Sequence, residues 1–348
     1  MFKPKYEITH ALLENIKRVY NLVQTLNQRR FPHTILVELQ KNAEAVSAFA
    51  STSIEGNPLP LTDVKRILKN TPQNIRDSER EVLNYNTALK DINKKLVNGN
   101  LPFTLNLVLQ IHKQVTHKLL PPHQSGKLRS DPVFVNDPRE RTTIYWPPDA
   151  KDVPALIKDL ILFVESNSTI VDPLILAGLF HKQMVVIHPF MDGNGRNTRL
   201  LTKILLANMG LNTFNLFSFE NYYNQNVTRY FQIVGVRGDY YEIKENINYS
   251  PWLEYFTGGL IDELLRVEKT LPPPRVNPKD ELKPYHQQIL DFIRENGYIT
   301  DRDYAGIVDR ARPTRRLDFN KLIGSGLIKR QGKGKNTYYT LKENKISE

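Results

Sequence analysis

The sequence contains no cysteine. Disulfide bonds and thiolate metal sites are therefore excluded, and the absence fits a cytoplasmic address. Long apolar runs are also missing, because no segment reaches the roughly eighteen unbroken apolar residues that a membrane-spanning helix requires. The segment Met1–Glu7 carries no apolar signal region. We therefore expect a cytoplasmic protein without a membrane partner.

The chain is 348 residues long, and 40% of its residues are hydrophobic, which is ordinary for a globular protein. This length allows one large core and a smaller second domain. Lysine and arginine outnumber aspartate and glutamate, so the formal net charge is +11. An excess of that size raises the question of an acidic partner such as nucleic acid.

The most informative segment runs from His188 to Arg199 and reads His-Pro-Phe-Met-Asp-Gly-Asn-Gly-Arg-Asn-Thr-Arg. Apolar runs at Leu174–Ile187 and Leu200–Met209 flank it and predict two buried helices. The segment is then a loop that ends where the second helix begins. A helix start offers unpaired N–H groups, and glycines let a backbone curl around a phosphate. The pattern therefore predicts a phosphate site.

The side chains of this segment suit phosphate chemistry. His188 titrates near neutrality and can accept a proton from an attacking hydroxyl. Asp192 is a hard oxygen ligand of the kind that Mg²⁺ prefers. Arg196 and Arg199 fall on neighbouring positions of the first helical turn, from which both can reach outer phosphates.

The segment matches, without a mismatch, the pattern His-Pro-Phe-x-Asp/Glu-Gly-Asn-Gly-Arg-x-x-Arg, and the chain resembles the Fic family. Most members of that family transfer AMP from ATP to a hydroxyl of a target protein. The resemblance implies ATP as substrate, Mg²⁺ as cofactor and release of pyrophosphate. The residues that it implicates are the base His188, the metal ligand Asp192, an anion hole of Gly193, Asn194 and Gly195, and the phosphate ligands Arg196 and Arg199.

A second motif lies upstream, where an alanine-rich helical pattern stops at Gly56 and Pro58. Ser51 and Glu55 lie on one face of this helix. The stretch resembles the inhibitory motif Ser/Thr-x-x-x-Glu-Gly/Asn of many Fic proteins. That resemblance implies that Glu55 pairs with Arg199 and blocks the seat of the ATP γ-phosphate. An ordinary exposed glutamate is the alternative, and in some family members this residue instead orients water for removal of AMP.

Two further segments are interpreted through the same resemblance. The runs 131–135 and 139–148 flank a predicted turn at 136–138, and family members carry here a β-hairpin flap that clamps the target protein by strand addition. A plain two-stranded ribbon is the alternative. Asn226 and Tyr230, on a helical pattern over 221–231, match positions that often line the adenine pocket. A packing role in the core is equally compatible with them.

The C-terminal part begins after the proline-rich segment 271–279, which predicts a stiff linker. Helical patterns at 285–295, 301–309 and 313–323 precede a hairpin with a basic tip, and this order resembles a winged helix-turn-helix module. Residues 310–335 contain nine basic residues against the single acid Asp318. Binding of DNA through 310–335 and docking of a protein both remain open.

The predicted fold class is mostly α, with a Fic-type helical core, a β-hairpin flap and a small C-terminal winged helix. The predicted regions are 1–100 with the inhibitory helix, the catalytic core 101–270, the linker 271–279 and the winged helix 280–348. The predicted activity is AMP transfer under inhibition by Glu55. A DNA-binding regulator with a nucleotide-sensing core, removal of AMP, and another phosphate-bearing donor are the alternatives, and a homodimer is a further expectation from relatives.

Overall fold

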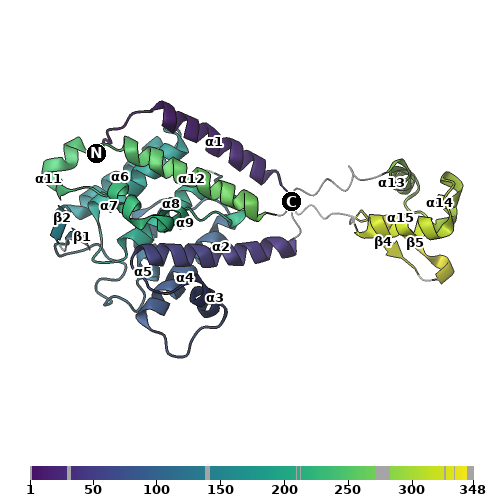
Figure 1. Ribbon diagram of the computed structural model, residues 1–348, viewed down its shortest axis with the longest axis horizontal. Coiled ribbons are helices and arrows are strands. Elements are labelled where there is room, and N and C mark those ends of the chain that lie inside the picture. The colour runs from purple at the N-terminus through teal and green to yellow at the C-terminus, as the bar shows by residue number, and fades with distance from the viewer. Residues whose placement is uncertain are drawn as a thin grey trace. The chain divides into compact units, whose positions relative to one another are not determined.

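The computed structural model describes residues 2–29, 33–137, 142–208, 210–211, 213–271, 283–324, 327–332 and 334–342. The chain forms two compact units, Met1–Leu271 and Pro272–Glu348 (Figure 1). Apart from Leu271, the proline-rich linker segment 271–279 lies outside the described residues.

Helices dominate the first unit, as the sequence predicts. None of the helices in the described part of the chain is both long and apolar enough to cross a membrane. The helices are α1 (His10–Asn27), α2 (His33–Ile54), α3 (Leu61–Lys69), α4 (Asp77–Val97), α5 (Leu105–Val115), α6 (Val153–Asn167), α7 (Pro173–Ile187), α8 (Asn194–Asn208), α9 (Glu220–Gln225), α10 (Val227–Val234), α11 (Tyr240–Ile243) and α12 (Ser250–Thr270).

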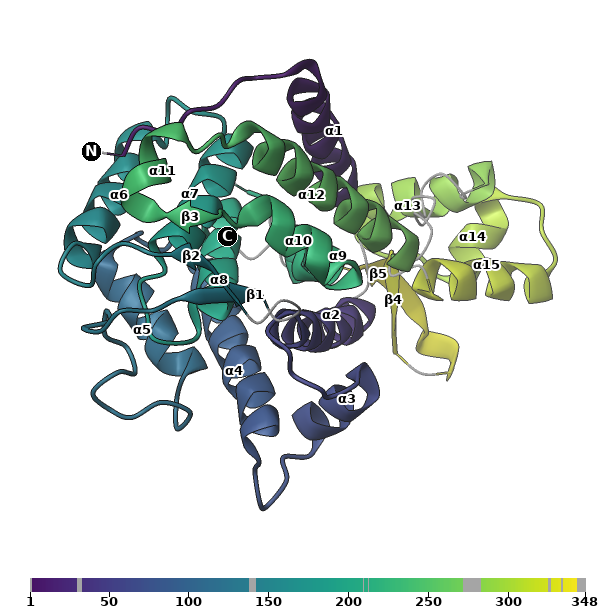
Figure 2. The ribbon, with the colours of Figure 1, turned by 60° about the vertical axis from the view of Figure 1, so that its left-hand side comes forward.

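Helix α7 forms the centre of this unit, and α6, α8 and α12 pack against it (Figure 2). Nearly every side chain of α7 is buried, as expected for a helix that is apolar on all sides. The helix begins where Asp172 Oδ1 accepts a hydrogen bond from Leu174 N at 2.8 Å and Pro173 occupies the first turn. Helices α7 and α8 confirm the two buried helices that were predicted from the apolar runs on either side of the motif.

The N-terminal hundred residues belong to the same compact unit as the predicted core. Helix α1 packs along α12, and α2 packs against α4, α8 and α9. The boundary predicted between residues 100 and 101 therefore does not separate two compact bodies. Helices α1 and α2 bury their apolar faces partly against helices that follow residue 100 in the sequence.

The predicted flap is a hairpin of β1 (Val135–Asp137) and β2 (Thr142–Trp146), but its turn was misplaced. Asn136 and Asp137 pair with Thr143 and Thr142 in the ladder instead of turning. Thr143 Oγ1 donates to Asn136 Oδ1 at 2.9 Å, so the asparagine side chain supports strand pairing. Strand β3 (Gly238–Asp239), which the sequence did not predict, adds parallel to β2.

The single helical pattern predicted over 221–231 is also wrong in detail, because the chain forms two short helices, α9 and α10. Asn226 separates them with a non-helical backbone conformation (φ −145°, ψ 74°), and its Oδ1 accepts a hydrogen bond from Arg229 N at 3.0 Å. The preference of asparagine for helix N-caps therefore outweighs the helical spacing of its neighbours.

The second unit contains α13 (Pro284–Asn296), α14 (Asp301–Ile307), α15 (Arg312–Gly324) and the antiparallel pair β4 (Ile328–Gln331) and β5 (Tyr338–Leu341). This order of elements is the one the sequence predicts. Thr300 caps α14, and Gly297 ends α13 in the left-handed conformation at φ 80°. A separate apolar core, which includes Ile289, Tyr304 and Phe319, holds the unit together.

Candidate active site

The motif loop leaves α7 through His188, which adopts a left-handed conformation at φ 51° and ψ 61°. A residue other than glycine needs support in this region of backbone space. Arg129 provides it, since its Nε donates to His188 O at 2.9 Å and its backbone N donates to Pro189 O at 3.0 Å. Arg129 itself is buried. A buried guanidinium therefore holds the backbone of His188 in this conformation.

Burial lowers the pKa of His188, and the carbonyl of Val185 and the carboxylate of Glu55 oppose the shift without reversing it. The imidazole is therefore neutral at neutral pH, the state in which it can accept a proton.

Asn194 shapes the loop with its side chain. Its Oδ1 accepts from Phe190 N and its Nδ2 donates to Phe190 O, each at 2.9 Å. The anion hole implied by the resemblance includes this residue together with Gly193 and Gly195. Because both ends of the Asn194 amide are engaged with Phe190, the backbone N–H groups at the start of α8 are the donors better placed for an anion.

The loop is also held by His112, a buried residue of α5 to which the sequence assigned no role. Gly126 N donates to His112 Nδ1 at 2.9 Å, and His112 Nε2 lies 2.9 Å from Asp192 O. The ring stacks on Phe190 with centroids 3.7 Å apart. A histidine among the apolar residues of 105–115 is the signal that could have identified it, because a buried imidazole needs polar partners.

Arg199 lies in the first turns of α8 and is fully buried. Its Nε donates to Ser51 Oγ, and its Nη2 donates to Ser51 O and to Glu55 Oε1, all at 2.8 Å. Burial disfavours its charge, but the carboxylate of Glu55 outweighs that effect and raises the pKa of Arg199. The structure therefore brings Ser51, Glu55 and Arg199 together, as the resemblance implied.

Gly195 lets Glu55 approach the start of α8. A Cβ on Gly195 would lie 2.0 Å from Glu55 Oε1 and 2.8 Å from Arg199 Nη1. The carboxylate of Glu55 therefore stands against the helix start, where the dipole and the free N–H groups favour a negative charge. An internal carboxylate occupies a position that suits a phosphate.

Arg196 is buried between two further acids. Its Nη2 lies 2.9 Å from Asp192 Oδ2, and its Nη1 lies 3.1 Å from Glu81 Oε1 on α4. Glu81 is a third acid at this site, and no motif pointed to it. Within the described part of the chain, Arg196 Nε and Arg199 Nη1 are buried donors without a hydrogen-bond partner. Unsatisfied guanidinium donors at a glycine-rich helix start fit an anionic ligand.

Tyr230 and Asn226, the predicted adenine contacts, lie in different surroundings. Tyr230 is buried, stacks on Tyr223 and has its hydroxyl 3.1 Å from His181 Nε2. Asn226 is exposed, and its side chain caps α10. Tyr230 is therefore a core residue near the motif, and Asn226 is the N-cap residue of α10.

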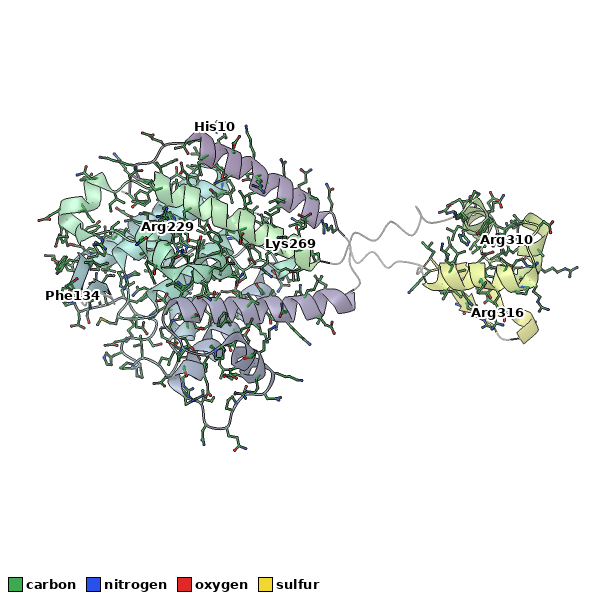
Figure 3. All side chains as sticks on the ribbon, viewed as in Figure 1. His10, Phe134, Arg229, Lys269, Arg310 and Arg316 are labelled. Carbon is green, nitrogen blue, oxygen red and sulfur yellow. The ribbon has the colours of Figure 1, made fainter. Side chains whose placement is uncertain are left out.

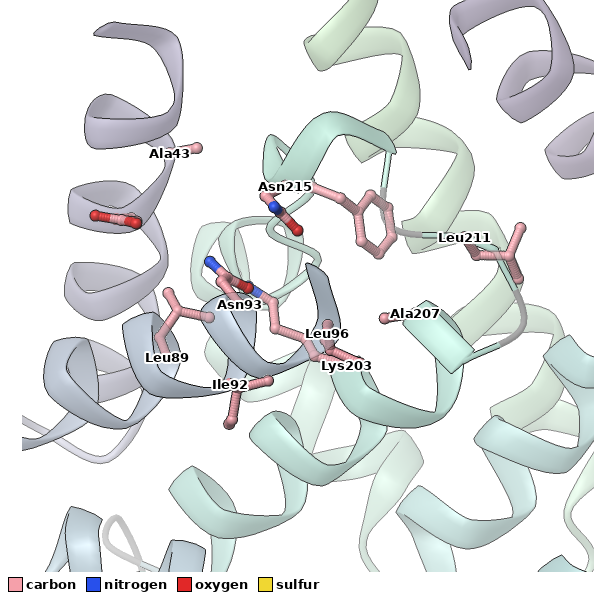
Figure 4. Close-up of a pocket in the computed structure, with 11 residues that line it drawn as sticks. Ala43, Leu89, Ile92, Asn93, Leu96, Lys203, Ala207, Leu211 and Asn215 are labelled. Atoms are coloured by element: carbon pink, nitrogen blue, oxygen red, sulfur yellow. The ribbon is translucent and has the colours of Figure 1, made fainter. Parts of the chain in front are cut away.

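Helix α2, which ends at Ile54 directly before Glu55, is anchored by a buried carboxylate on α9. Glu220 Oε1 accepts from Tyr85 OH at 2.6 Å and from Ser47 Oγ at 3.2 Å, and it lies 3.3 Å from Lys203 Nζ. A cavity of about 30 Å³, enough for roughly two waters, lies beside this network and is lined by Ala43, Asn93 and Lys203 among others (Figure 4). The network ties α2 to α4, α8 and α9.

The architecture and the loop together define a helical protein built around an anion site at a helix start. Residues 102–206 match the Fic/DOC family. The curated relatives include the protein adenylyltransferase Fic of Aedes aegypti, 30% identical over 217 residues, which cover 57% of this chain and 42% of the relative. That of Drosophila grimshawi is 31% identical over 220 residues, covering 56% and 43%.

The solved structures that resemble the chain include a Fic family protein from Desulfovibrio desulfuricans, with a TM-score of 0.65, 21% identity and 98% coverage of both chains. A Fic domain containing signaling protein from Bacteroides thetaiotaomicron has a TM-score of 0.60 and 21% identity, over 74% of this chain and 96% of that one. The chain therefore contains a Fic/DOC-family domain at residues 102–206. It spans 42% to 43% of the length of the curated relatives named above.

Proposed function

We propose that this protein is a protein adenylyltransferase that transfers AMP from ATP to a hydroxyl of a target protein and that Glu55 holds it inactive. The observation that carries the proposal is the pair of Glu55 and Arg199 at the start of α8, where an internal carboxylate stands in for a phosphate. The names of the curated relatives support the reaction class.

The chemistry requires positioning and charge stabilisation more than covalent work by the protein. The target oxygen attacks the α-phosphorus of ATP in line, the new O–P bond forms, and the bond to the β-phosphate oxygen breaks with loss of pyrophosphate. His188 takes the proton of the hydroxyl. The N–H groups of the first α8 turn stabilise the α-phosphate, and Arg196 and Arg199 hold the β- and γ-phosphates.

Asp192 fits the role of a magnesium ligand. Its side chain is 57% exposed, and Oδ2 contacts Arg196. The described residues contain no group of three or more His, Cys, Asp or Glu side chains that could hold a metal. A Mg²⁺ ion would therefore arrive with the nucleotide, bound by one carboxylate and the phosphates, and would neutralise charge on the leaving pyrophosphate.

The switch follows from competition for Arg199. Leaving one member of a buried ion pair without its partner costs on the order of 3 kcal/mol. If separation of Glu55 from Arg199 costs this much, about 99% of molecules have the pair closed. Glu55→Gly removes the competing carboxylate, and we expect AMP transfer to rise on the order of tenfold to hundredfold.

The test is incubation with ATP labelled at the α-phosphate. Glu55→Gly should attach label to protein, and Glu55→Gly combined with His188→Ala should lose it by at least about a hundredfold. Glu245→Gly, which removes an exposed acid elsewhere, should behave as the native protein does. Absence of label from Glu55→Gly would refute the enzyme, and equal label on native protein would refute the switch. Release of AMP from labelled target by native protein alone would instead support the alternative role of Glu55.

We further propose that the target protein binds along the flap, residues 131–148. Strand β1 pairs with β2 on one side only among the described residues, so its second edge can accept an added strand. Phe134 and Trp146 are exposed beside it. Sequencing of the labelled peptide tests this binding mode, since it requires a modified hydroxyl in an extended segment; a label within a helix of the target would contradict it.

A second proposal concerns the C-terminal unit, for which we infer binding of duplex DNA. The exposed face of α15 carries Arg316 (Figure 3). Lys329 and Arg330 are exposed on β4. The count of nine basic residues against one acid needs a correction, because Asp301, outside the counted window, pairs with Arg315 at 2.9 Å and Asp318 pairs with Arg310 at 2.8 Å. The charge available for phosphates is therefore smaller than the sequence count suggests.

A further inference from the structure

A cavity of about 550 Å³ lies between α7, α10 and α12. Helices α10 and α12 run against each other in this part of the unit (Figure 2). Its lining contains none of the residues of the 188–199 motif, so it is separate from the candidate active site. The residues that line it are Lys182, Arg229, Gln232, Ile233, Gly235, Asn248, Pro251, Glu254 and Tyr255.

Lys182 is buried, with 5% of its surface exposed, whereas the other residues of the lining are partly or fully exposed. Its Nζ donates to Ile233 O at 2.9 Å, near the end of α10. An ammonium group has three N–H donors. Two of them lack an acceptor among the residues that the structure describes. Burial lowers the pKa of Lys182 to about 8, so the group is still largely charged at neutral pH.

The remaining charges of the lining favour an anion. Arg229, which is labelled in Figure 3, is exposed and adds a second cation to the lining. Glu254 is the single carboxylate, and its Oε1 already accepts from Thr9 Oγ1 at 2.5 Å. Tyr255 stays protonated, because burial raises its pKa to about 12. The amides of Gln232 and Asn248 add neutral groups at the rim.

We propose that this cavity binds a small oxyanion, the carboxylate or phosphate group of a metabolite, with Lys182 on its floor and Arg229 at its mouth. The two N–H groups of Lys182 that lack acceptors would donate to the oxyanion, and Arg229 would supply a second, charge-assisted contact. The volume exceeds that of a bare phosphate, so there is room beside Tyr255 for the rest of a metabolite that carries the oxyanion. The site is independent of the proposed AMP transfer.

Calorimetric titration of the full chain with citrate and, separately, with inorganic phosphate tests the proposal at constant ionic strength near neutral pH. At least one anion should bind, and the anion that does so identifies the carboxylate or the phosphate class. Lys182→Met keeps the aliphatic length and removes the ammonium, and it should weaken the affinity at least about tenfold. Arg229→Gln should weaken it several-fold, and Lys158→Met, at an exposed site outside the cavity, should not.

A second measurement avoids reliance on a variant that fails to fold. The affinity of native protein should fall as the pH rises through about 8, because the ammonium of Lys182 deprotonates. Three results would overturn the proposal: no heat with either anion, an affinity that survives Lys182→Met, or one that is flat with pH. An affinity unaffected by Lys182→Met would place the anion elsewhere, for example at the motif loop, and would reduce Lys182 to a cap of α10.

Discussion

At the scale of single residues, the hydrogen bonds of His112 define its protonation. Gly126 N–H can donate only to an unprotonated Nδ1, so the proton must sit on Nε2, which donates it to Asp192 O. Burial lowers the pKa of His112 to about 4, in agreement with a neutral ring. His112 is therefore a positioning residue that fixes the carbonyl just before Gly193, which has a φ of +78°.

His112→Phe should keep the stacking on Phe190 and lose both hydrogen bonds. We expect a loss of about 1–3 kcal/mol in the free energy of unfolding, because Gly126 N and Asp192 O are left unpaired. In the Glu55→Gly background, AMP transfer should fall on the order of tenfold. Chemical denaturation and labelled-ATP assays measure the two effects. An unchanged stability would show that the two bonds do not hold the loop.

Residues of the motif could be predicted from the sequence because they lie within one loop and their types suit one chemistry. Ser51, Glu55 and Arg199 were also predicted to meet, through the resemblance, and the structure places them within hydrogen-bond distance. Glu81, His112 and Glu220 were not found. Each comes from another helix, and nothing in local spacing indicates which distant helix packs against the loop.

At the scale of elements, α15 separates structural from exposed basic residues. Arg315 contacts Asp301 through Nε and Nη2, at 3.0 and 2.9 Å, and so ties α15 to α14. Arg316, one position later, points to solvent. Neighbouring arginines on one helix therefore have different roles, which a count of charges along the sequence cannot distinguish.

Retention of the full chain on random duplex DNA tests the inferred DNA binding. Arg316→Gln and Lys329→Gln should each weaken retention and reduce the salt dependence by about one counterion. Arg294→Gln, an exposed arginine of α13 paired with Asp291, is the matched control. Native protein that is not retained at low salt would leave protein docking as the role of this unit.

Element boundaries were predicted less well than element types. The prediction of a turn at 136–138 was wrong because asparagine and aspartate are compatible with both a turn and a strand. Pairing of Asn136 and Asp137 with β2 decides in favour of the strand. Strand β3 has only two residues, Gly238 and Asp239, and forms because β2 offers an edge. Such a short strand has no periodicity of its own to detect.

At the scale of the whole molecule, buried histidines set the dependence of stability on pH. The pKa values of His112, His181 and His188 are all lowered, mainly by burial. The unfolded chain then binds more protons than the folded chain below the ordinary histidine pKa of about 6.5. Stability is therefore complete above that pH and is lost as the pH falls from about 6.5 toward 4.

Denaturation of the native protein at about pH 7.5 and pH 5.5 should show a loss of roughly 3 kcal/mol, shared mainly between His112 and His181. His112→Phe should remove close to half of this difference, and His10→Gln, at an exposed histidine, should leave it intact. Buried Glu263, whose pKa is raised by desolvation, acts in the opposite direction at lower pH. A flat profile over this interval would contradict the neutral, buried state of these rings.

Arg199 has no contact with solvent while it is paired with Glu55. If Glu55 simply withdrew, a bare cation would be stranded in the interior, at a cost of about 3–5 kcal/mol. Under the proposed inhibition, Arg199 is paired with Glu55, paired with a nucleotide phosphate, or unpaired, and the unpaired form is the rarest of these three. Activation is then an exchange of one negative group at Arg199 for another. ATP would then release the inhibition by displacing Glu55 as well as donate the AMP.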